Sequence, residues 1–151
     1  MADYRYTESG LDNVMIRGMT VPVDDAGEEV YSIPNVRGLH KVIVRCVITR
    51  DCGLSPKDIR FLRTEMGYTQ AQLAELLKKD HQTIGRWERG EMPMDQNAEF
   101  AIRMLAREKL NIDTEMSIED MLRSCVPSAE PGSIVIDGTD PTHYKPWQEA
   151  A

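Results

Sequence analysis

The spacing of apolar and polar positions divides the chain into segments of two kinds. Residues 4–34 alternate apolar and polar side chains in short runs, which Gly10, Gly18 and an Asp-Asp-Ala-Gly stretch interrupt. This pattern is typical of two or three short strands. Residues 35–50 instead carry apolar side chains at helical intervals after Asn35, a suitable N-cap. Residues 1–52 are therefore predicted to form a small N-terminal module of strands and one helix.

From Ser55 onward, the apolar spacing predicts five short helices between Pro56 and Cys125. Ser55 is a cap, Pro56 is the residue favoured at the first helical position, and Gly67 would end this helix. The next four helices would begin at capping residues, namely Thr69, Asp80, Asp95 or Asn97, and Ser117. Residues 53–125 are thus expected to form an all-α domain.

The same spacing indicates which side chains face the core and where the core ends. The expected inward positions of the five helices are Ile59, Leu62 and Met66; Leu73, Ala74, Leu76 and Leu77; Thr83, Ile84 and Trp87; Ala98, Ala101, Ile102, Leu105 and Ala106; and Ile118, Met121, Leu122 and Cys125. Residues 126–151 mix Pro, Gly and acidic residues and are interpreted as a flexible tail without a core of its own, although Ile134–Ile136 and Trp147 could dock elsewhere. The predicted fold class is α+β.

The charge of the chain is acidic overall but uneven along the sequence. The formal net charge is -7. Residues 1–52 carry six Lys and Arg against eight Asp and Glu, residues 53–110 carry ten against nine, and residues 111–151 carry two against eight. Because recognition of nucleic acid depends on local charge, the acidic total does not exclude a DNA-binding surface within residues 53–110.

The cysteines and histidines predict neither a disulfide framework nor a metal site. Three cysteines at unrelated spacings, with no secretory hydrophobic region before them, indicate a reduced, cytoplasmic protein. Cys46, Cys52, His40 and His143 lack the spacing of zinc ligands. No apolar run approaches the roughly 18 residues that span a bilayer. We therefore expect no cofactor and no membrane partner.

The third predicted helix carries the side chains that are suited to reading DNA. A recognition helix places polar side chains at its N-terminal end, because that end enters the major groove. After Asp80, this helix presents His81, Gln82, Gly85 and Arg86 on the expected outward side. Gln can bind adenine and Arg can bind guanine, each through two hydrogen bonds. A helical hairpin with a solvated polar face would show the same residues without binding DNA.

Residues 59–93, with the sequence IRFLRTEMGYTQAQLAELLKKDHQTIGRWERGEMP, resemble the Xre or lambda-repressor-like helix-turn-helix family. The resemblance rests on an Arg in the first helix, a Gly, Thr-Gln, Leu-Ala, the turn, a helix cap and a final Trp-Glu-x-Gly. It implies that Arg63 and Glu88 form a structural ion pair. It further implies that Gln70, His81, Gln82, Gly85, Arg86 and Arg89 contact DNA. The remaining candidate contacts beside the recognition helix are Lys78, Lys79 and Thr83.

The turn of this motif departs from the family pattern. Lys78 stands where the family has Gly, so Lys78 either adopts a left-handed conformation at a cost of about 1 kcal/mol or alters the turn. Lys79 replaces an apolar residue, and its methylene stem can cover the core. After Gly90 the chain supplies acidic rather than basic residues. We hypothesise that Lys78 and Lys79 meet the phosphate backbone and partly replace that missing basic loop.

Residues 1–52 bear a weaker resemblance to the N-terminal domain of MqsA-like, or YgiT-type, antitoxins. The similarity lies in the stretch GLDNVMI, the strands, the short helix and the following SPKDIRFLR. Those proteins bind zinc through pairs of Cys-x-x-Cys, and this chain has none. The resemblance therefore implies an antitoxin-like module without its metal site.

These observations predict a sequence-specific transcriptional regulator, a repressor that binds a palindromic operator in double-stranded DNA as a homodimer. A narrower form of the hypothesis makes the chain the antitoxin of a toxin–antitoxin pair that regulates its own operon. The alternative is a protein-binding adaptor that has the helix-turn-helix fold but does not bind DNA. No Ser-His-Asp order, phosphate-binding Gly loop or carboxylate pair supports catalysis, so we do not expect an enzyme.

Overall fold

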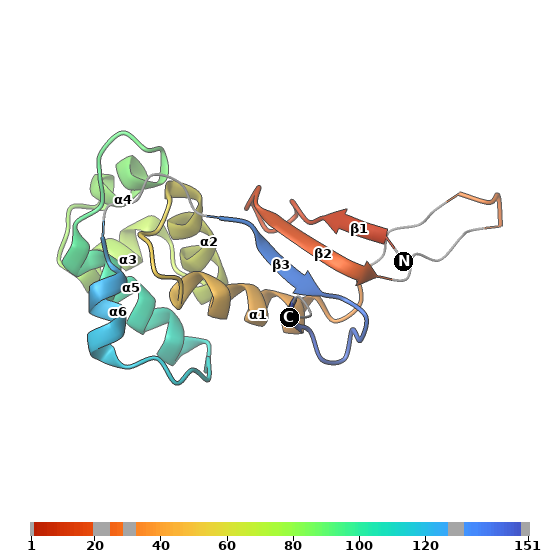
Figure 1. Ribbon diagram of the computed structural model, residues 1–151. Helices are drawn as coiled ribbons and strands as arrows, with labels where there is room; N and C mark the ends of the chain where they lie inside the picture. Colours follow the sequence, from red (N-terminus) through yellow and green to blue (C-terminus); the bar gives the residue numbers. More distant parts are fainter. Residues whose placement is uncertain (1, 20–24, 29–32, 127–131, 149–151) are drawn as a thin grey trace. The chain divides into compact units, whose positions relative to one another are not determined.

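The computed structural model describes residues 2–19, 25–28, 33–126 and 132–148 (Figure 1). The chain divides into two compact units, one formed by residues 1–43 and 132–151 and the other by residues 44–131. The elements in chain order are β1 (Ala2–Arg5), β2 (Val14–Met19), α1 (Val36–Ile48), α2 (Pro56–Met66), α3 (Gln70–Leu77), α4 (His81–Glu88), α5 (Gln96–Lys109), α6 (Ile118–Ser124), β3 (Ile134–Asp137) and β4 (Lys145–Pro146).

The first unit contains a mixed four-stranded sheet with the strand order β1-β2-β3-β4. Strand β2 pairs antiparallel with β1 and parallel with β3, and β3 pairs antiparallel with β4. Alternate side chains of β2 and β3 are buried, including Val14, Ile16 and Ile136, as expected for strands with one face on a core. Gly138 lets the chain pass close to β2, because a Cβ there would lie 2.5 Å from Cγ2 of Ile16.

The prediction that residues 126–151 form a tail without a core is wrong for its central part. Strand β3 lies beside β2 with Val14 opposite Ile134 and Ile16 opposite Ile136. The triplet Ile134–Ile136 therefore docks as a strand of the N-terminal sheet, and the first unit comprises residues 1–43 and 132–151 instead of the predicted residues 1–52. The acidic composition concealed this strand, because its partner lies more than 110 residues earlier in the chain. Residues 127–131 and 149–151 of the predicted tail lie outside the described residues.

Helix α1 begins where the sequence places it. Asn35 has a positive φ of 52°, its side-chain Oδ1 accepts a hydrogen bond from the Gly38 amide at 3.2 Å, and its amide Nδ2 donates to the Pro141 carbonyl at 2.9 Å. Within the same unit, Tyr6 and His40 are joined by a 2.6 Å hydrogen bond. Strands β1 and β2 confirm two of the two or three predicted strands, and any third strand within residues 20–24 or 29–32 lies outside the described residues.

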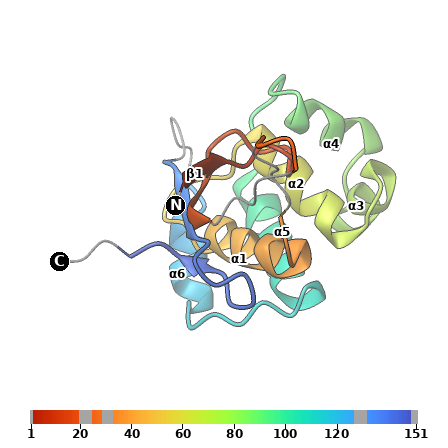
Figure 2. The same cartoon turned by 90° about the vertical axis from the view of Figure 1, so that its right-hand side faces the viewer.

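The second unit contains the five helices predicted between Pro56 and Cys125, and local side-chain bonds explain where several of them begin. Ser55 and Thr69 form capping boxes with Asp58 and Gln72, while Asp80 and Asp95 cap α4 and α5. Gly67 ends α2 in the left-handed conformation. Figure 2 shows α3 and α4 side by side, as their shared contacts require. The predicted α+β class is thus confirmed.

The core of the helical unit contains most, but not all, of the expected side chains. Leu62, Leu73, Ile84, Ile102 and Met121 are fully buried. Three predicted core residues are instead about half exposed, because the core-facing side of each short helix is narrower than its apolar stripe; they are Leu76, Ile118 and Leu122.

Three buried charged residues, which the sequence pattern did not indicate, hold residues 48–54 in place. Arg103 is completely buried and donates to the carbonyls of Ile48, Arg50 and Cys52. The Oε1 atom of Glu99 accepts the Leu54 amide hydrogen at 2.7 Å. The third is Asp58, which pairs with Arg50 at 2.7 Å. Burial of charge is stable here because each side chain is paired or hydrogen-bonded, although Arg103 Nε itself has no partner.

Candidate nucleic-acid interface

The turn between α3 and α4 depends on the backbone of Lys78. Lys78 adopts the left-handed conformation, with φ 59° and ψ 41°. The Lys78 amide donates to Glu75, and the Lys79 amide donates to the Ala74 carbonyl at 2.9 Å. These two hydrogen bonds end α3 in the way that is usual for a helix ending at a left-handed glycine. Of the two alternatives that the sequence left open, the structure has the left-handed lysine and an unaltered turn.

Helix α4 separates an exposed polar side from a buried apolar side. The Asp80 side chain accepts the Gln82 amide hydrogen at 2.9 Å and so starts the helix. Gln82 and Arg86 are exposed and lie one turn apart, and Arg86 Nη2 donates to Gln82 Oε1 at 3.3 Å. Ile84 and Trp87 point into the core. The exposed side therefore presents an amide and a guanidinium next to each other.

The other two predicted contacts near the start of α4 differ in exposure. His81 is the first residue of the helix, and 72% of its side chain is exposed. Thr83 is only partly exposed, and its amide donates to the Asp80 carbonyl. His81 thus lies on the accessible surface together with Gln82 and Arg86, whereas Thr83 stands at the edge of the core.

Gly85 does not lie on the outward side of α4, contrary to our expectation. It is buried, and a Cβ at this position would lie 2.9 Å from Arg89 Nη1 and 3.3 Å from Gln70 Oε1. The Arg89 and Gln70 side chains thus fill the space that Gly85 leaves free. Gly85 therefore contributes to the packing of α4 against Gln70 of α3.

A polar network joins α2, α3 and α4 beneath the exposed face. Arg63 donates to Glu88 through Nε at 2.6 Å and Nη2 at 2.9 Å, and through Nη1 to the Tyr68 carbonyl. Gln70 Nε2 donates to the same Glu88 carboxylate at 3.3 Å. Hydrogen bonding to Glu88 raises the pKa of Arg63. Because only 15% of Arg63 and 5% of Glu88 are exposed, this pair fixes α4 against α2.

Two of the cations predicted to contact DNA are paired with carboxylates in the loop between α4 and α5. Lys79 Nζ lies 3.1 Å from Asp95 Oδ2, and Arg89 Nε donates to Glu91 at 2.9 Å. Hydrogen bonding to Lys79 lowers the pKa of Asp95, and hydrogen bonding to Arg89 lowers the pKa of Glu91. Both carboxylates thus remain charged near neutral pH. Lys78 is exposed, so the positive charge near α4 comes mainly from Lys78 and Arg86.

The described residues contain no group of three or more His, Cys, Asp or Glu side chains that could hold a metal ion. Nor does the described part of the chain contain a helix long and apolar enough to cross a membrane. What residues 56–90 do bring together is a capped helix pair, a tight turn and an exposed Gln-Arg pair on the second helix.

Comparison with known proteins identifies this helical arrangement. The helix-turn-helix family model matches residues 59–112, which run from the first turn of α2 to just beyond α5. Neither the curated proteins nor the solved structures gave a match to the chain. The match extends over about a third of the sequence and does not include the N-terminal module. Residues 59–112 therefore match the helix-turn-helix family model, in agreement with the arrangement of α2 to α5.

Proposed function

We propose that this protein is a cytoplasmic, sequence-specific transcriptional repressor that inserts α4 into the major groove of its operator. The observation that carries this proposal is the exposed pair of Gln82 and Arg86 on a helix whose opposite side is anchored by Trp87 and the Arg63–Glu88 pair. A reading helix must be rigid because a small tilt moves side chains away from base edges.

The chemistry of the exposed side favours a mixed-sequence half-site. An Arg side chain binds guanine through O6 and N7, and a Gln side chain binds adenine through N6 and N7. In the free protein, Arg86 donates to Gln82, and this bond would be exchanged for bonds to neighbouring bases. His81, Gln70 and Lys78 would contact bases or phosphates at the edges of this site. We assign Arg89 and Lys79 to phosphates, once their carboxylate partners release them.

Dimerisation would place two copies of α4 about 34 Å apart, one turn of DNA. The two candidate helices for the interface are α5 and α6, and α5 buries Ala98, Ile102 and Ala106 in its own domain. Helix α6 instead exposes Ile118 and Leu122, which are 55% and 47% exposed. We propose that α6 pairs with α6 of a second copy. An antiparallel arrangement would bring each Glu119 to the partner's Arg123, so this face is complementary to itself in charge.

The acidic C-terminal region favours a second, narrower function, that of an antitoxin. Residues 111–151 carry eight Asp and Glu against two Lys and Arg, and part of this stretch belongs to the sheet unit. Such a surface is complementary to a basic toxin protein. A neighbouring gene for a small basic ribonuclease would support this function.

The pairing of Lys79 and Arg89 with carboxylates is the observation that favours the remaining alternative, a protein-binding adaptor.

The DNA-binding proposal is tested by titrating the protein into the DNA upstream of its own gene. Arg86→Ala should lose roughly 1–3 kcal/mol of binding free energy and relax base preference at one position of the half-site. Arg37→Ala is the control, because it removes an exposed arginine on α1. Since few free cations face the DNA, the salt dependence should correspond to fewer than about six phosphates. No complex at low salt, with helical circular dichroism intact, would favour the adaptor.

A further inference from the structure

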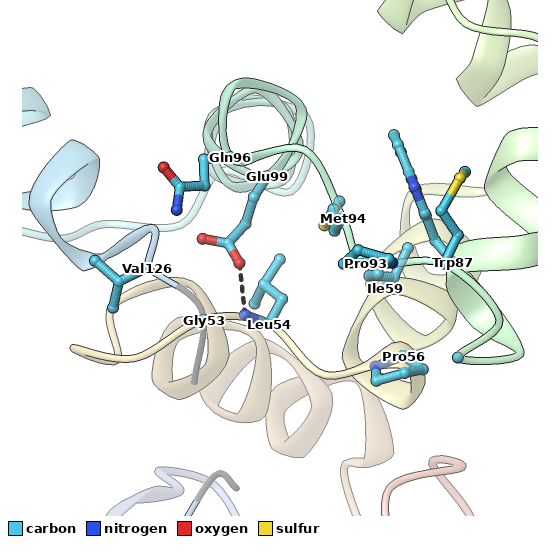
Figure 3. A pocket seen from close by; sticks show the side chains of 12 residues that line it. Gly53, Leu54, Pro56, Ile59, Trp87, Pro93, Met94, Gln96, Glu99 and Val126 are labelled. Carbon is cyan, nitrogen blue, oxygen red and sulfur yellow. Dashed lines mark hydrogen bonds between the residues drawn. The ribbon is translucent and has the colours of Figure 1, made fainter. Parts of the chain in front are cut away.

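A cavity of about 370 Å³ lies beside the end of α4, within the helical unit (Figure 3). Its walls come from five places: the segment that precedes α2, the first turn of α2, the last turn of α4 with the loop to α5, the first turn of α5, and Val126 after α6. Ligand pockets span about 300–1,000 Å³, so this one suits a molecule of one or two rings. The apolar side chains that form most of its wall include Pro56, Ile59, Trp87, Met92, Pro93 and Met94.

One end of the cavity carries hydrogen-bond acceptors. Figure 3 shows Glu99 reaching from α5 toward Leu54, with the Gln96 amide nearby and Trp87 and Met94 toward the other end. Glu99 Oε1 accepts the Leu54 amide hydrogen at 2.7 Å, and Oε2 lies 3.5 Å from Arg103 Nη2. The Cys125 thiol also hydrogen-bonds to Glu99. A carboxylate has about four lone-pair positions, so these three bonds leave one acceptor position.

The wall chemistry selects an uncharged aromatic ligand. The buried Arg103 guanidinium balances the negative charge of Glu99, so a cationic ligand would not be stabilised by a free counter-charge. Methionine sulfur and an indole ring favour an aromatic partner. The one remaining acceptor position of Glu99 favours a ligand with a single N–H or O–H donor at this end of the cavity.

We propose that this cavity binds a small, uncharged aromatic molecule that bears one hydrogen-bond donor. Gly53 has a role in shaping it, because a Cβ there would overlap the Val126 carbonyl oxygen and approach Glu99 Oε1 to 3.2 Å. A ligand in this position contacts Trp87 and Gly90, at the C-terminal end of the DNA-reading helix. Its occupancy therefore alters the support of α4, a consequence that rests on the proposed function.

The binding proposal can be tested without DNA, using indole and its near-isostere indene, which lacks the N–H donor. The protein has two tryptophans. Trp87 lines the cavity and Trp147 lies in the sheet unit, so their side-chain N–H signals in a nitrogen–proton NMR spectrum report the site and an internal control. The variant Trp147→Phe identifies the two signals. Indole should shift the Trp87 signal saturably and leave the Trp147 signal in place, with roughly fivefold weaker binding of indene.

A pair of matched variants separates the cavity from non-specific binding. Val126→Phe fills the open side of the cavity and should abolish saturation, whereas Val36→Phe, at a valine of nearly equal exposure on α1, should leave it unchanged. A linear shift of Trp87 without saturation, or unchanged affinity in Val126→Phe, would overturn the site. Equal affinity for indole and indene would overturn the assigned donor.

The consequence for DNA needs a separate measurement. Saturating indole should change the affinity for the operator at least threefold in the wild-type protein and not in Val126→Phe. If indole saturates the Trp87 signal but operator affinity is unchanged, the coupling to α4 is wrong. If the protein forms no complex with DNA, the proposed function fails while the NMR result on the cavity stands.

Discussion

Glu88, on α4, connects three helices of the helix-turn-helix motif. Its carboxylate accepts from Arg63 on α2 and Gln70 on α3. The sequence was sufficient to identify Arg63 as the partner of Glu88, because the resemblance to the helix-turn-helix family implies an ion pair at these two positions. Burial of the pair and its third partner, Gln70, depend on how the helices pack, which no local pattern specifies.

Glu88→Ala should reduce the stability of the domain by about 3 kcal/mol, because it leaves the nearly buried Arg63 guanidinium without its counter-charge. The measurement is thermal unfolding followed by circular dichroism. Glu75→Ala, which removes an exposed carboxylate from α3, should leave the melting temperature nearly unchanged. If Glu88→Ala weakened DNA binding and left stability intact, Glu88 would be a recognition residue instead.

Cys125 should be the least reactive thiol of the folded chain. Burial, together with hydrogen bonding and charge from Glu99, raises the pKa of Cys125 to about 12, and only the thiolate reacts with iodoacetamide. At pH 8, alkylation of Cys125 should be at least about a hundredfold slower in the folded than in the urea-unfolded protein, where the pKa returns to its ordinary range. Mass spectrometry of each cysteine measures this, and equal rates in the two states would contradict the burial.

The same shift predicts how stability depends on pH. Between about pH 9 and 12, the folded protein keeps the Cys125 proton while the unfolded chain releases it. The unfolded state then binds fewer protons, so the contribution of Cys125 to stability is lost as the pH rises through this range.

At the scale of elements, the α3–α4 turn shows what a side chain costs in a left-handed conformation. Lys78→Gly should stabilise the domain by roughly 0.5–1 kcal/mol, because glycine adopts this conformation without the Cβ clash. Lys78→Ala is the matched variant: it removes the same charge but keeps the Cβ, and it should give no such gain. Thermal unfolding distinguishes them, and equal stability of both variants would show that the turn is unstrained.

These two variants also test the hypothesis that Lys78 meets a phosphate. If it does, both should weaken binding to all DNA sequences about equally and reduce the salt slope by about one. Lys79 differs, since its ammonium already pairs with Asp95, the cap of α5. The two lysines are therefore not equivalent, because Lys79 has to leave Asp95 before it can reach a phosphate.

At the scale of the whole molecule, the C-terminal segment is part of the sheet unit. Ile136→Ala should destabilise that unit by about 2–5 kcal/mol, because Ile136 is fully buried opposite Ile16. Val135→Ala, on the partly exposed side of the same strand, should cost clearly less. Methyl and amide NMR signals of β2 during denaturation provide the measurement. An Ile136→Ala protein as stable as the wild type would restore the interpretation of residues 132–148 as a tail.

The sequence by itself determined the helical domain. Caps, left-handed residues and the 3.6-residue spacing act within a few positions of one another, so Ser55, Thr69, Asp80 and Gly67 could be assigned from local chemistry alone. The sequence also indicated which polar side chains of α4 are exposed. It did not indicate that Gly85 is buried, because the neighbour of Gly85, Gln70, belongs to another helix.

Only the tertiary structure decided the features that depend on residues far apart in the chain. The parallel pairing of β2 with β3 joins the two ends of the sequence, and short apolar triplets such as Ile134–Ile136 do not specify a partner. Likewise, Arg103 is an unremarkable helical arginine in the sequence but is buried among carbonyls of residues 48–52. Pairing and burial at long range are set by the sum of packing interactions, which the local order of residues does not contain.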